Sequence, residues 1–294
     1  MNLCDAGQVK ALLARRGFHF SRSMGQNFLI EDWVPREIAR ASGAGCGCGV
    51  LEVGPGIGVL TCRLSALADK VVSVELDRTL LPILEETLAG CGNVEIIPGD
   101  ILKIGLAELA EEKFPGMKVL ACANLPYNIT TPAITALIEA GCFSAVTVMV
   151  QREVARRICA APGSRDYGAF SVYCQYHTRP ELLFEVPPSC FLPAPKVTSA
   201  VLRMTPRAAP EEVEDPEYFF RVVRAAFAQR RKTLLNCLSA AFSPRLSREA
   251  LSGAVARCGL REDVRGERLG IPEFAALAGA LKELEGQRDD ISER

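Results

Sequence analysis

Short runs rich in valine and isoleucine alternate with helix-like segments from residue 50 onward, and this alternation constrains the fold more than any other feature. The runs lie at residues 50–53, 71–76, 94–97, 119–123 and 146–151. Apolar character on both faces is typical of buried parallel strands. Strands that alternate with helices form right-handed βαβ units. The sequence therefore predicts an α/β fold with a doubly wound parallel sheet.

Two further strands are expected after residue 180, at residues 182–186 and 197–204. They flank a loop at residues 187–195 that holds four prolines in nine residues, so this loop should be stiff and extended rather than helical. An antiparallel pair of strands commonly closes an otherwise parallel sheet. The pattern thus indicates a Rossmann-like sheet with an antiparallel closing hairpin.

Helical patterns occur before and after these strands. Residues 9–13 carry apolar side chains at helical spacing, and residues 33–41 form a second helical stretch. An acidic linker ends in Asp215-Pro216, an N-cap followed by proline at the first helical position, and the pattern then stays helical to residue 284. We expect a helical arm at residues 1–45, a central α/β domain at 46–206 and a small all-α domain at 207–294.

Charge is distributed unevenly along the chain. The 34 basic and 35 acidic residues give a net charge of −1, yet residues 50–145 carry 6 basic against 12 acidic residues. Residues 150–207 carry 8 against 4, and residues 218–248 carry 7 basic residues and no acid. This asymmetry favours a polyanionic partner for the second half of the chain. The alternative for residues 218–248 is an ordinary solvated face.

Composition excludes several classes of protein. Hydrophobic residues make up 49% and charged residues 23% of the 294 positions, which is typical of a globular chain and not of a disordered or collagen-like one. No apolar run reaches the roughly 18 residues of a membrane span, and no secretory signal is visible, so we expect a soluble, cytoplasmic protein. The 12 cysteines are interpreted as reduced apolar fillers rather than a zinc site or a disulfide framework, and the close-set Cys46 and Cys48 are assigned no role.

A glycine-rich turn follows the first predicted strand. Gly54, Gly56 and Gly58 have the spacing G-x-G-x-G, which lets the backbone approach a ligand closely, although a plain tight turn is the alternative. Glu75 ends the next strand, 21 residues beyond Gly54, where a carboxylate can bind both hydroxyls of a ribose, and Asp100 follows the third strand. No G-K-[ST] phosphate cradle is present. These features indicate an uncharged or cationic nucleoside ligand, and S-adenosylmethionine fits.

The fourth strand ends in Asn124-Leu125-Pro126-Tyr127. The exocyclic amine of an aromatic base is a poor nucleophile because its lone pair is delocalised into the ring. Two acceptors, the Asn124 side-chain carbonyl and the Leu125 backbone carbonyl held extended by Pro126, would favour a pyramidal nitrogen with its lone pair aimed at a methyl group. Tyr127 offers a flat face for the base. The alternative is a strand-end turn with a half-buried tyrosine, but the coincidence with the glycine turn favours catalysis.

The sequence resembles the ribosomal RNA adenine dimethyltransferase family, and within it the bacterial small-subunit branch. The resemblance covers most of the chain and is carried by Gly25-Gln26-Asn27-Phe28-Leu29, Glu52-Val53-Gly54-Pro55-Gly56, Val74-Glu75-Leu76-Asp77, Asn124 to Ile129 followed by Thr130-Thr131-Pro132, Gln151-Arg152-Glu153-Val154, Tyr167-Gly168, Pro195-Lys196-Val197 and Arg230-Arg231-Lys232-Thr233. It implies a class I S-adenosylmethionine-dependent methyltransferase whose catalytic domain is residues 46–206. Its implied activity is dimethylation of the N6 amine of two adjacent adenosines in a hairpin loop near the 3′ end of 16S rRNA, in small-subunit biogenesis.

The resemblance also implies roles for individual residues. The cofactor S-adenosylmethionine would be bound by Asn27, Leu29, Gly54, Gly56, Glu75, Asp100 and Asn124. The target base would be held by the catalytic residues Asn124, Leu125, Pro126, Tyr127 and Phe191. Of these, Tyr127 would stack on one face of the base and Phe191, in the proline-rich loop, would cover the other, although the sequence alone favours a core position for Phe191 equally.

Basic residues in the second half of the chain would hold the RNA. The candidate phosphate contacts are Arg152, Arg156, Arg157, Lys196, Arg221, Arg224, Arg231 and Lys232. On one helix, Arg221, Arg224, Arg231 and Lys232 would fall within an arc of about 100°, and a helix break is expected near Gln229. We expect small-subunit rRNA or a pre-30S particle as the partner, no metal, no membrane and a monomeric protein.

Two other functions stay open from the sequence. A large-subunit adenine methylase of the antibiotic-resistance type shares the same pocket, although the long helical C-terminal domain and residues 128–132 favour the small-subunit enzyme. A non-catalytic RNA-binding assembly or transcription factor could use the same fold. The intact Asn-Leu-Pro-Tyr motif and glycine turn argue against that second alternative.

Overall fold

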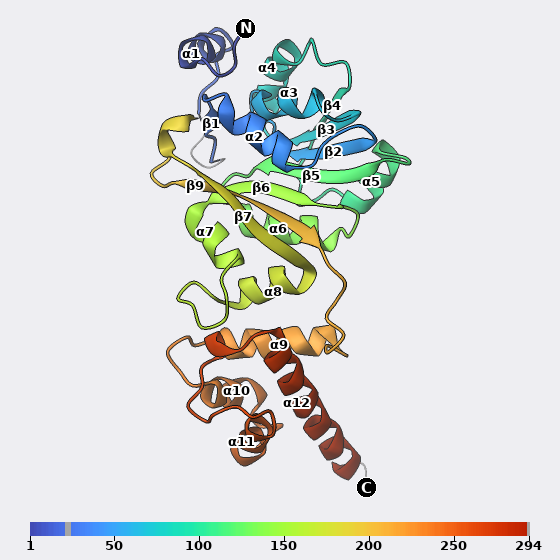
Figure 1. The fold of residues 1–294 in the computed structure, drawn as a ribbon, viewed down its shortest axis with the longest axis vertical. Helices are drawn as coiled ribbons and strands as arrows, with labels where there is room; N and C mark the ends of the chain where they lie inside the picture. The colour runs from blue at the N-terminus through green and yellow to red at the C-terminus, as the bar shows by residue number, and fades with distance from the viewer. Residues whose placement is uncertain (21–24, 293–294) are drawn as a thin grey trace. The chain divides into compact units, whose positions relative to one another are not determined.

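Seven strands form one sheet in the order β4-β3-β2-β5-β6-β9-β7 (Figure 1). The five strands from β4 to β6 pair in parallel, and β9 pairs antiparallel with β6. The bounds are β2 Cys48–Val53, β3 Lys70–Glu75, β4 Val94–Pro98, β5 Lys118–Asn124, β6 Val146–Gln151, β7 Thr178–Val186 and β9 Ser199–Pro206. The predicted α/β fold, with a doubly wound parallel sheet closed by antiparallel pairing, is confirmed.

The computed structural model describes residues 1–20 and 25–292, with side chains described up to residue 286. Its contacts divide the chain into two units, Met1–Ala155 with Arg179–Pro206, and Arg156–Thr178 with Arg207–Arg294. The expected central domain at 46–206 included residues 156–178. In the structure these residues group with the C-terminal helices and not with the sheet. Residues 21–24 of the expected arm lie outside the described part.

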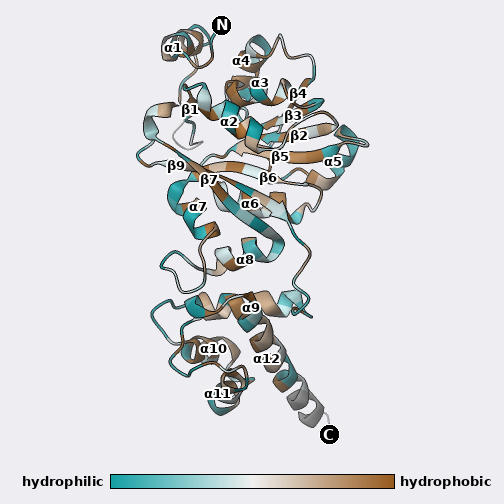
Figure 2. Ribbon diagram, in the orientation of Figure 1, coloured by the Kyte–Doolittle hydropathy of each residue, from teal (hydrophilic) through white to brown (hydrophobic). Residues whose placement is uncertain are grey.

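Helices cover both faces of the sheet in the first unit. Every residue of β2 is buried, and so are five of the six residues of β6. Since successive side chains of a strand point to opposite faces, both faces must be covered. Figure 2 colours much of β5 and β6 as hydrophobic. The helices of this unit are α1 Ala6–Arg15, α2 Trp33–Ala41, α3 Val59–Ser65, η1 Arg78–Leu80, α4 Leu81–Thr87, α5 Leu106–Lys113 and α6 Thr130–Glu139, with α7 Arg152–Ile158 crossing into the second unit.

A two-stranded sheet attaches the N-terminal arm to the proline-rich loop. Strand β1 (Phe28–Leu29) pairs antiparallel with β8 (Phe191–Leu192), which follows the short helix η2 (Pro188–Cys190). The Ile30 N–H extends this pairing by donating to the Cys190 carbonyl at 2.9 Å. The chain entering the sheet is thus fixed to a segment more than 150 residues later.

The second unit is helical and has its own core. Its helices are α8 Ala169–His177, α9 Pro216–Phe227, α10 Leu234–Phe242, α11 Arg248–Arg257, η3 Gly266–Arg268 and α12 Ile271–Ser292. The N-cap predicted at Asp215 is present, since its side chain accepts from the Tyr218 N–H. Tyr176 of α8 packs against Phe219 and Phe220 of α9, with ring centroids 5.4 Å apart in a tilted pair and 5.0 Å apart in an edge-to-face pair. This aromatic packing explains why residues 156–178 belong to the helical unit.

Candidate functional site

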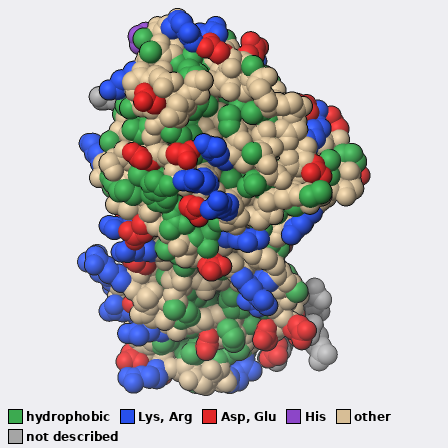
Figure 3. Space-filling view, turned by 45° about the horizontal axis from the view of Figure 1, so that its top comes forward, with side chains coloured by type: hydrophobic (Ala, Val, Ile, Leu, Met, Phe, Trp, Pro, Cys, Tyr) green, Lys and Arg blue, Asp and Glu red, His purple; other side chains and the backbone are tan. Residues whose placement is uncertain are grey.

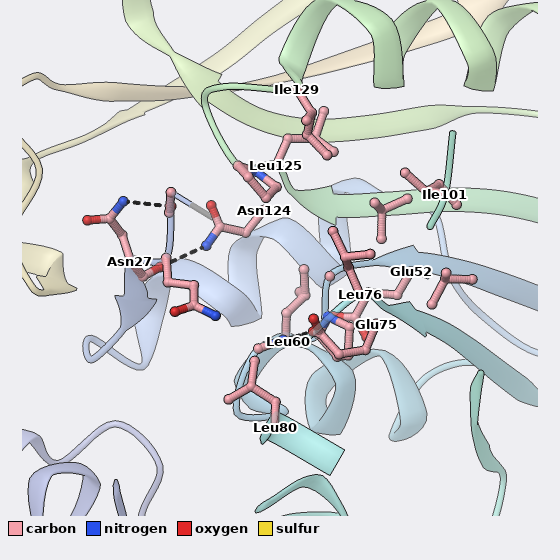
Figure 4. Close-up of a pocket in the computed structure, with 18 of the residues that line it drawn as sticks. Asn27, Glu52, Leu60, Glu75, Leu76, Leu80, Ile101, Asn124, Leu125 and Ile129 are labelled. Atoms are coloured by element: carbon pink, nitrogen blue, oxygen red, sulfur yellow. Dashed lines mark hydrogen bonds between the residues drawn. The ribbon is translucent and has the colours of Figure 1, made fainter. Parts of the chain in front are cut away.

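A cleft opens at the carboxyl ends of β2, β3, β4 and β5, and its empty space is about 1150 Å³ including the solvent at its mouth (Figure 4). It is lined chiefly by residues 25–29, 52–57, 74–76, 99–101 and 124–129. The chain order reverses between β2 and β5, because β3 and β4 lie on one side of β2 and β6 lies beyond β5. Ligands of open α/β sheets bind at such a switch point.

The glycine turn forms the floor of this cleft. The Gly54 N–H donates to the Val74 carbonyl at 2.9 Å, and its φ of +67° favours glycine. A Cβ built on Gly54 would meet nothing within 4 Å, so a ligand can approach the backbone there. Gly58 begins α3 at φ +87°, and a Cβ there would come within 2.9 Å of Leu88. The turn therefore requires glycine both for its conformation and for packing.

Glu75 ends β3 beside this turn and is only 6% exposed. Its carboxylate accepts from the Asp77 N–H at 2.8 Å and from the Gly56 N–H at 3.3 Å. Burial raises the pKa of Glu75 to about 7, although these two hydrogen bonds act in the opposite direction. Glu75 is therefore a rigidly held carboxylate facing the cleft.

Glu52, at the end of β2, is a cleft residue to which the sequence analysis gave no role. It is 1% exposed, and its Oε2 accepts from the Thr61 and Ser73 hydroxyls at 2.7 and 2.6 Å. Its Oε1 has no hydrogen-bond partner within the described residues. Burial raises the pKa of Glu52 to about 7. The signal for it was present in the motif Glu52-Val53-Gly54-Pro55-Gly56, but a single acid in a strand carries no role by itself.

The charge of the cleft is one-sided. Asp100 follows β4 and is partly exposed, with its Oδ1 accepting from the Leu102 N–H at 3.0 Å. Three acids, Glu52, Glu75 and Asp100, line the cleft, whereas none of its described lining residues is Lys, Arg or His. Such a site fits a neutral or cationic nucleoside and disfavours a phosphate group. The cleft has open space at Gly54 and a rigidly held carboxylate at Glu75. It therefore accommodates a ribose-bearing cation such as S-adenosylmethionine.

The turn at residues 124–127 lies at the opposite end of the cleft. The Asn124 Nδ2 donates to the Asn27 backbone carbonyl at 3.3 Å, and Figure 4 shows its oxygen pointing away from Asn27. The Leu125 side chain is 1% exposed, and its N–H donates to the Met149 carbonyl at 3.1 Å, which anchors the backbone before Pro126. Side-chain and backbone oxygens of adjacent residues are thereby held at the end of β5.

Tyr127 is half-buried at this end of the cleft. Its hydroxyl lies 2.6 Å from the Ser199 Oγ at the start of β9. Burial raises the pKa of Tyr127, and the Ser199 hydrogen bond acts against this shift. Sequence reasoning missed Ser199, because nothing local connects it with a residue 72 positions earlier.

The comparisons with known proteins agree with this geometry. The sequence profile described as "Ribosomal RNA adenine dimethylase" matches residues 17–262. The chain belongs to the ribosomal RNA adenine dimethylase family.

Curated relatives in the family are similar over nearly their whole length. The chain is 45% identical to the ribosomal RNA small subunit methyltransferase A of Alkaliphilus oremlandii, over 93% of this chain and 96% of the relative. It is also 45% identical to the protein of that name from Geobacillus thermodenitrificans, over 96% and 98%. Both matches therefore include the sheet and the helical unit.

Solved structures share the fold. A dimethyladenosine transferase from Plasmodium falciparum has a TM-score of 0.70 and 23% identity, covering 87% of this chain and 98% of its own. The 23S rRNA methyltransferase ErmE has a TM-score of 0.65 and 26% identity, covering 87% and 99%. The family member described here therefore has the fold expected of an S-adenosylmethionine-dependent methyltransferase.

The structure brings together all seven residues expected to bind the cofactor. Asn27, Leu29, Gly54, Gly56, Glu75, Asp100 and Asn124 all line the cleft, as do Leu125, Pro126 and Tyr127. Phe191 is the exception. It is 3% exposed, pairs with Leu29 and belongs to the hydrophobic core rather than to the cleft lining. The β1–β8 pairing holds it inside the core, the position that the sequence favoured equally, and its covering of the target base stays a prediction.

The candidate RNA contacts are divided between the two units of this dimethylase. Arg152 and Lys196 belong to the first, whereas Arg156, Arg157, Arg221, Arg224, Arg231 and Lys232 belong to the second. Arg152 forms an ion pair with Glu185 at 3.2 Å. Figure 3 shows Lys and Arg side chains spread over the face in view, with acidic side chains among them.

The expected basic arc on one helix is wrong. Helix α9 ends at Phe227, close to the break expected near Gln229, so Arg231 and Lys232 lie in the turn before α10. Arg221 is also committed elsewhere, since it pairs with Glu285 at 3.4 Å and lies 4.6 Å from the centre of the Phe242 ring. Arg224, Arg231 and Lys232 are exposed.

The described residues contain neither a group of side chains that could hold a metal ion nor a membrane-spanning helix. Over residues 1–20 and 25–292 no cluster of His, Cys, Asp and Glu side chains is suited to a metal ion. In the same part of the chain no helix combines the length and apolar character needed to cross a membrane.

Proposed function

We propose that this protein transfers methyl groups from S-adenosylmethionine to the N6 amine of adenosines in small-subunit rRNA. Its proposed targets are two adjacent adenosines in a hairpin loop near the 3′ end of 16S rRNA, each methylated twice. The observation that carries the proposal is the meeting of the Asn124 amide and the Glu75 carboxylate in one cleft. The names of the 45% identical relatives support the small subunit as the source of the RNA.

The cofactor would lie along the β2–β3–β4 side of the cleft. Glu75 would accept hydrogen bonds from the ribose hydroxyls, Gly54 would allow close approach to the backbone, and Asp100 would accept from an exocyclic amine. When bound, S-adenosylmethionine supplies an electrophilic methyl group on a positively charged sulfur. The three acids of the cleft favour that positive charge, and the absence of basic lining among the described residues leaves it unopposed.

The target amine would be held by the turn at the end of β5. The Asn124 Oδ1 and the Leu125 carbonyl would each accept one N–H of the amine, so that its lone pair faces the cofactor side of the cleft. Correct placement of the two reactants can supply most of the rate enhancement. Tyr127 would stack on the base, which must leave its helix or loop stack to reach the cleft.

No strong general base is required for this transfer. The product ammonium is acidic and can lose its proton to water, and neither His19 nor His177 lines the cleft. A second methylation would place a monomethylated amine at the same two acceptors. That amine has one N–H left, so one acceptor must then suffice.

The exposed basic residues Arg224, Arg231 and Lys232 are proposed to contact RNA phosphates. We expect the double charge reversal Arg231→Glu with Lys232→Glu to weaken RNA binding about tenfold and to lower the slope of log affinity against log salt. The matched control is Arg261→Glu, which changes an exposed arginine that pairs with Asp263. Equal affinity and equal slope in the double variant would contradict the role of these residues.

The function is tested by methyl transfer to ribosomal particles. Small subunits and large subunits isolated from cells lacking their own adenine dimethylation are incubated with the protein and tritiated S-adenosylmethionine, and the labelled bases are mapped. We expect label on two adjacent adenosines of the small-subunit RNA only. Label on the large-subunit RNA would favour the large-subunit adenine methylase instead, and no label on either would refute an enzymatic role.

A further inference from the structure

A chain of hydrogen bonds links the carboxylate at one end of the cleft to the amide at the other. The Asp77 N–H donates to the Glu75 Oε1 at 2.8 Å, and the Gln26 Nε2 donates to the Asp77 Oδ2 at 2.6 Å. Gln26 is followed by Asn27, whose backbone carbonyl accepts from the Asn124 Nδ2 at 3.3 Å. The N-terminal arm thus forms the middle of this chain.

Asp77 is well placed to anchor the arm. It is 8% exposed, and its Oδ1 accepts from the Thr79 N–H at 2.9 Å and the Thr79 hydroxyl at 2.6 Å, which caps the short helix η1. The remaining Oδ2 is the atom that receives Gln26. A carboxylate fixed in this way offers the arm an acceptor whose position does not depend on the arm itself.

The orientation of the Asn124 amide depends on the anchored arm, because its Oδ1 accepts hydrogen bonds whereas its Nδ2 donates them. With the Nδ2 on the Asn27 carbonyl, the Oδ1 is left to accept from a target amine. If the arm moved away, the amide could turn and present its NH₂ group, and a donor would then face the N–H groups of the target. The arm is held on its other side by the β1–β8 pairing, and the Gln26 side chain ties the residue before Asn27 to the segment after β3.

We propose that Gln26 and Asp77 are positioning residues for methyl transfer, which fix the arm so that the Asn27 carbonyl orients the Asn124 amide. The proposal rests on the function proposed above, because it assumes that the Asn124 Oδ1 accepts from the target amine. It also couples the two ends of the cleft, since Asp77 holds Glu75 through its backbone and Gln26 through its side chain.

The experiment exchanges the polarity of the Gln26–Asp77 bond. Gln26→Glu places two carboxylates against each other. Asp77→Asn keeps the Oδ1 that caps Thr79, and the Gln26 amide can turn to accept from the new NH₂ group, so this single variant can keep the hydrogen bond. The double variant restores one donor and one acceptor with their places exchanged. Gln8→Glu is the matched control, because it makes the same change in the same arm at an exposed side chain that accepts from the Asn2 N–H.

The rates are measured at saturating S-adenosylmethionine and saturating small-subunit particles, with thermal unfolding and cofactor affinity recorded separately. We expect Gln26→Glu to lower kcat about tenfold, Asp77→Asn and the double variant to stay within about threefold of the wild type, and the control to match the wild type. Where a single variant does not fold, Gln26→Met, which removes the donor without adding charge, takes its place with the same expected loss.

Three outcomes decide between the proposals. A Gln26→Glu variant with wild-type kcat, or a double variant as slow as Gln26→Glu alone, would overturn the positioning role. A purely structural role would lower the unfolding temperature and leave kcat per folded molecule unchanged, which also overturns it. A wild-type protein that methylates neither ribosomal subunit would instead refute the proposed function, so the two failures are distinguishable.

Discussion

The two ends of the cleft are built in different ways. At the cofactor end, the Glu75 carboxylate is held by N–H groups 2 and 19 residues away in the sequence. At the base end, the Asn124 amide and the Tyr127 hydroxyl are held by groups 97 and 72 residues away. One end is therefore local, within neighbouring βαβ units, and the other depends on the N-terminal arm and on β9.

This difference predicts how each end responds to change. A local site keeps its geometry as long as β2, β3 and the glycine turn are folded. The base end can lose its geometry while the sheet stays intact, because the arm and β9 can shift without unfolding β5. Substitutions at the base end should therefore act on the rate of transfer and on RNA binding, whereas substitutions at the cofactor end should act on cofactor affinity and on stability.

The largest expected effect is that of Asn124→Ala. Removal of the side-chain acceptor should lower kcat about a thousandfold, because a hydrogen-bond acceptor aimed at the reacting group is lost, whereas the Kd for S-adenosylmethionine should change far less. Single-turnover methyl transfer and calorimetric titration measure the two quantities. Asn128→Ala makes the same change at an exposed side chain in the same turn and should cost much less. A loss confined to cofactor affinity would contradict the assignment of Asn124 to the base end.

Sequence reasoning succeeded where structure is local. The helix expected at residues 33–41 is α2 Trp33–Ala41, and the strand expected at 146–151 is β6 Val146–Gln151. Both are specified by short-range apolar periodicity. The clustering of Gly54, Glu75 and Asp100 was likewise predictable, because the carboxyl ends of parallel strands meet at one edge of the sheet.

Sequence reasoning was incomplete where contacts between distant segments determine the position of a residue. The β1–β8 pairing places Phe191 in the core, a position that the sequence left open because no local pattern predicts this pairing. Helix α9 ends at Phe227, and Arg230 then contacts the Arg165 carbonyl at 2.6 Å and Glu267 at 3.6 Å, so the predicted basic arc is interrupted. The Tyr127–Ser199 contact was missed for the same reason, since its partner lies in a distant segment.

The second largest effect is expected at Glu75. Glu75→Ala should weaken S-adenosylmethionine binding about a hundredfold, the loss of roughly two hydrogen bonds to a charged acceptor, and should leave kcat at saturating cofactor within a few-fold of the wild type. Because the pKa of Glu75 is raised to about 7, the ionised form that accepts both ribose hydroxyls and favours a cation is gained between pH 6 and pH 8. Cofactor affinity should rise over that range.

Titration calorimetry at several pH values tests this dependence, with Glu75→Gln as the non-titrating control. The Gln variant should bind weakly at every pH and lose most of the rise between pH 6 and pH 8. A wild-type cofactor affinity that falls as the pH rises would contradict the predicted direction of this dependence. A large loss of kcat in Glu75→Ala at saturating cofactor would contradict the separate roles of the cofactor end and the base end.

A smaller effect is expected on stability at Glu52. Its folded-state pKa is raised from 4.5 to about 7, so the folded protein keeps a proton that the unfolded chain releases between these values. The stability that this group contributes is therefore fully present below pH 4.5 and is lost as the pH rises through 7, by about 3 kcal/mol. Denaturant unfolding at pH 5 and pH 8 should find Glu52→Gln relatively more stable at pH 8. If the free energies of unfolding of the wild type and of Glu52→Gln change by the same amount between pH 5 and pH 8, the raised pKa of Glu52 is refuted.

The smallest effect is expected for Ser199→Ala. This variant tests whether the base end of the cleft depends on a side-chain contact with β9. Without the Ser199 hydroxyl, the Tyr127 ring can turn about its side-chain bonds, so we expect the KM for RNA to rise about threefold, with cofactor affinity unchanged. Tyr127→Phe removes the same bond from the other side, and the double variant should be no worse than either single one. Ser189→Ala, at an exposed serine before Phe191, serves as the control. Additive losses would mean that the two hydroxyls act separately, and the base end would then depend on β9 through the backbone alone.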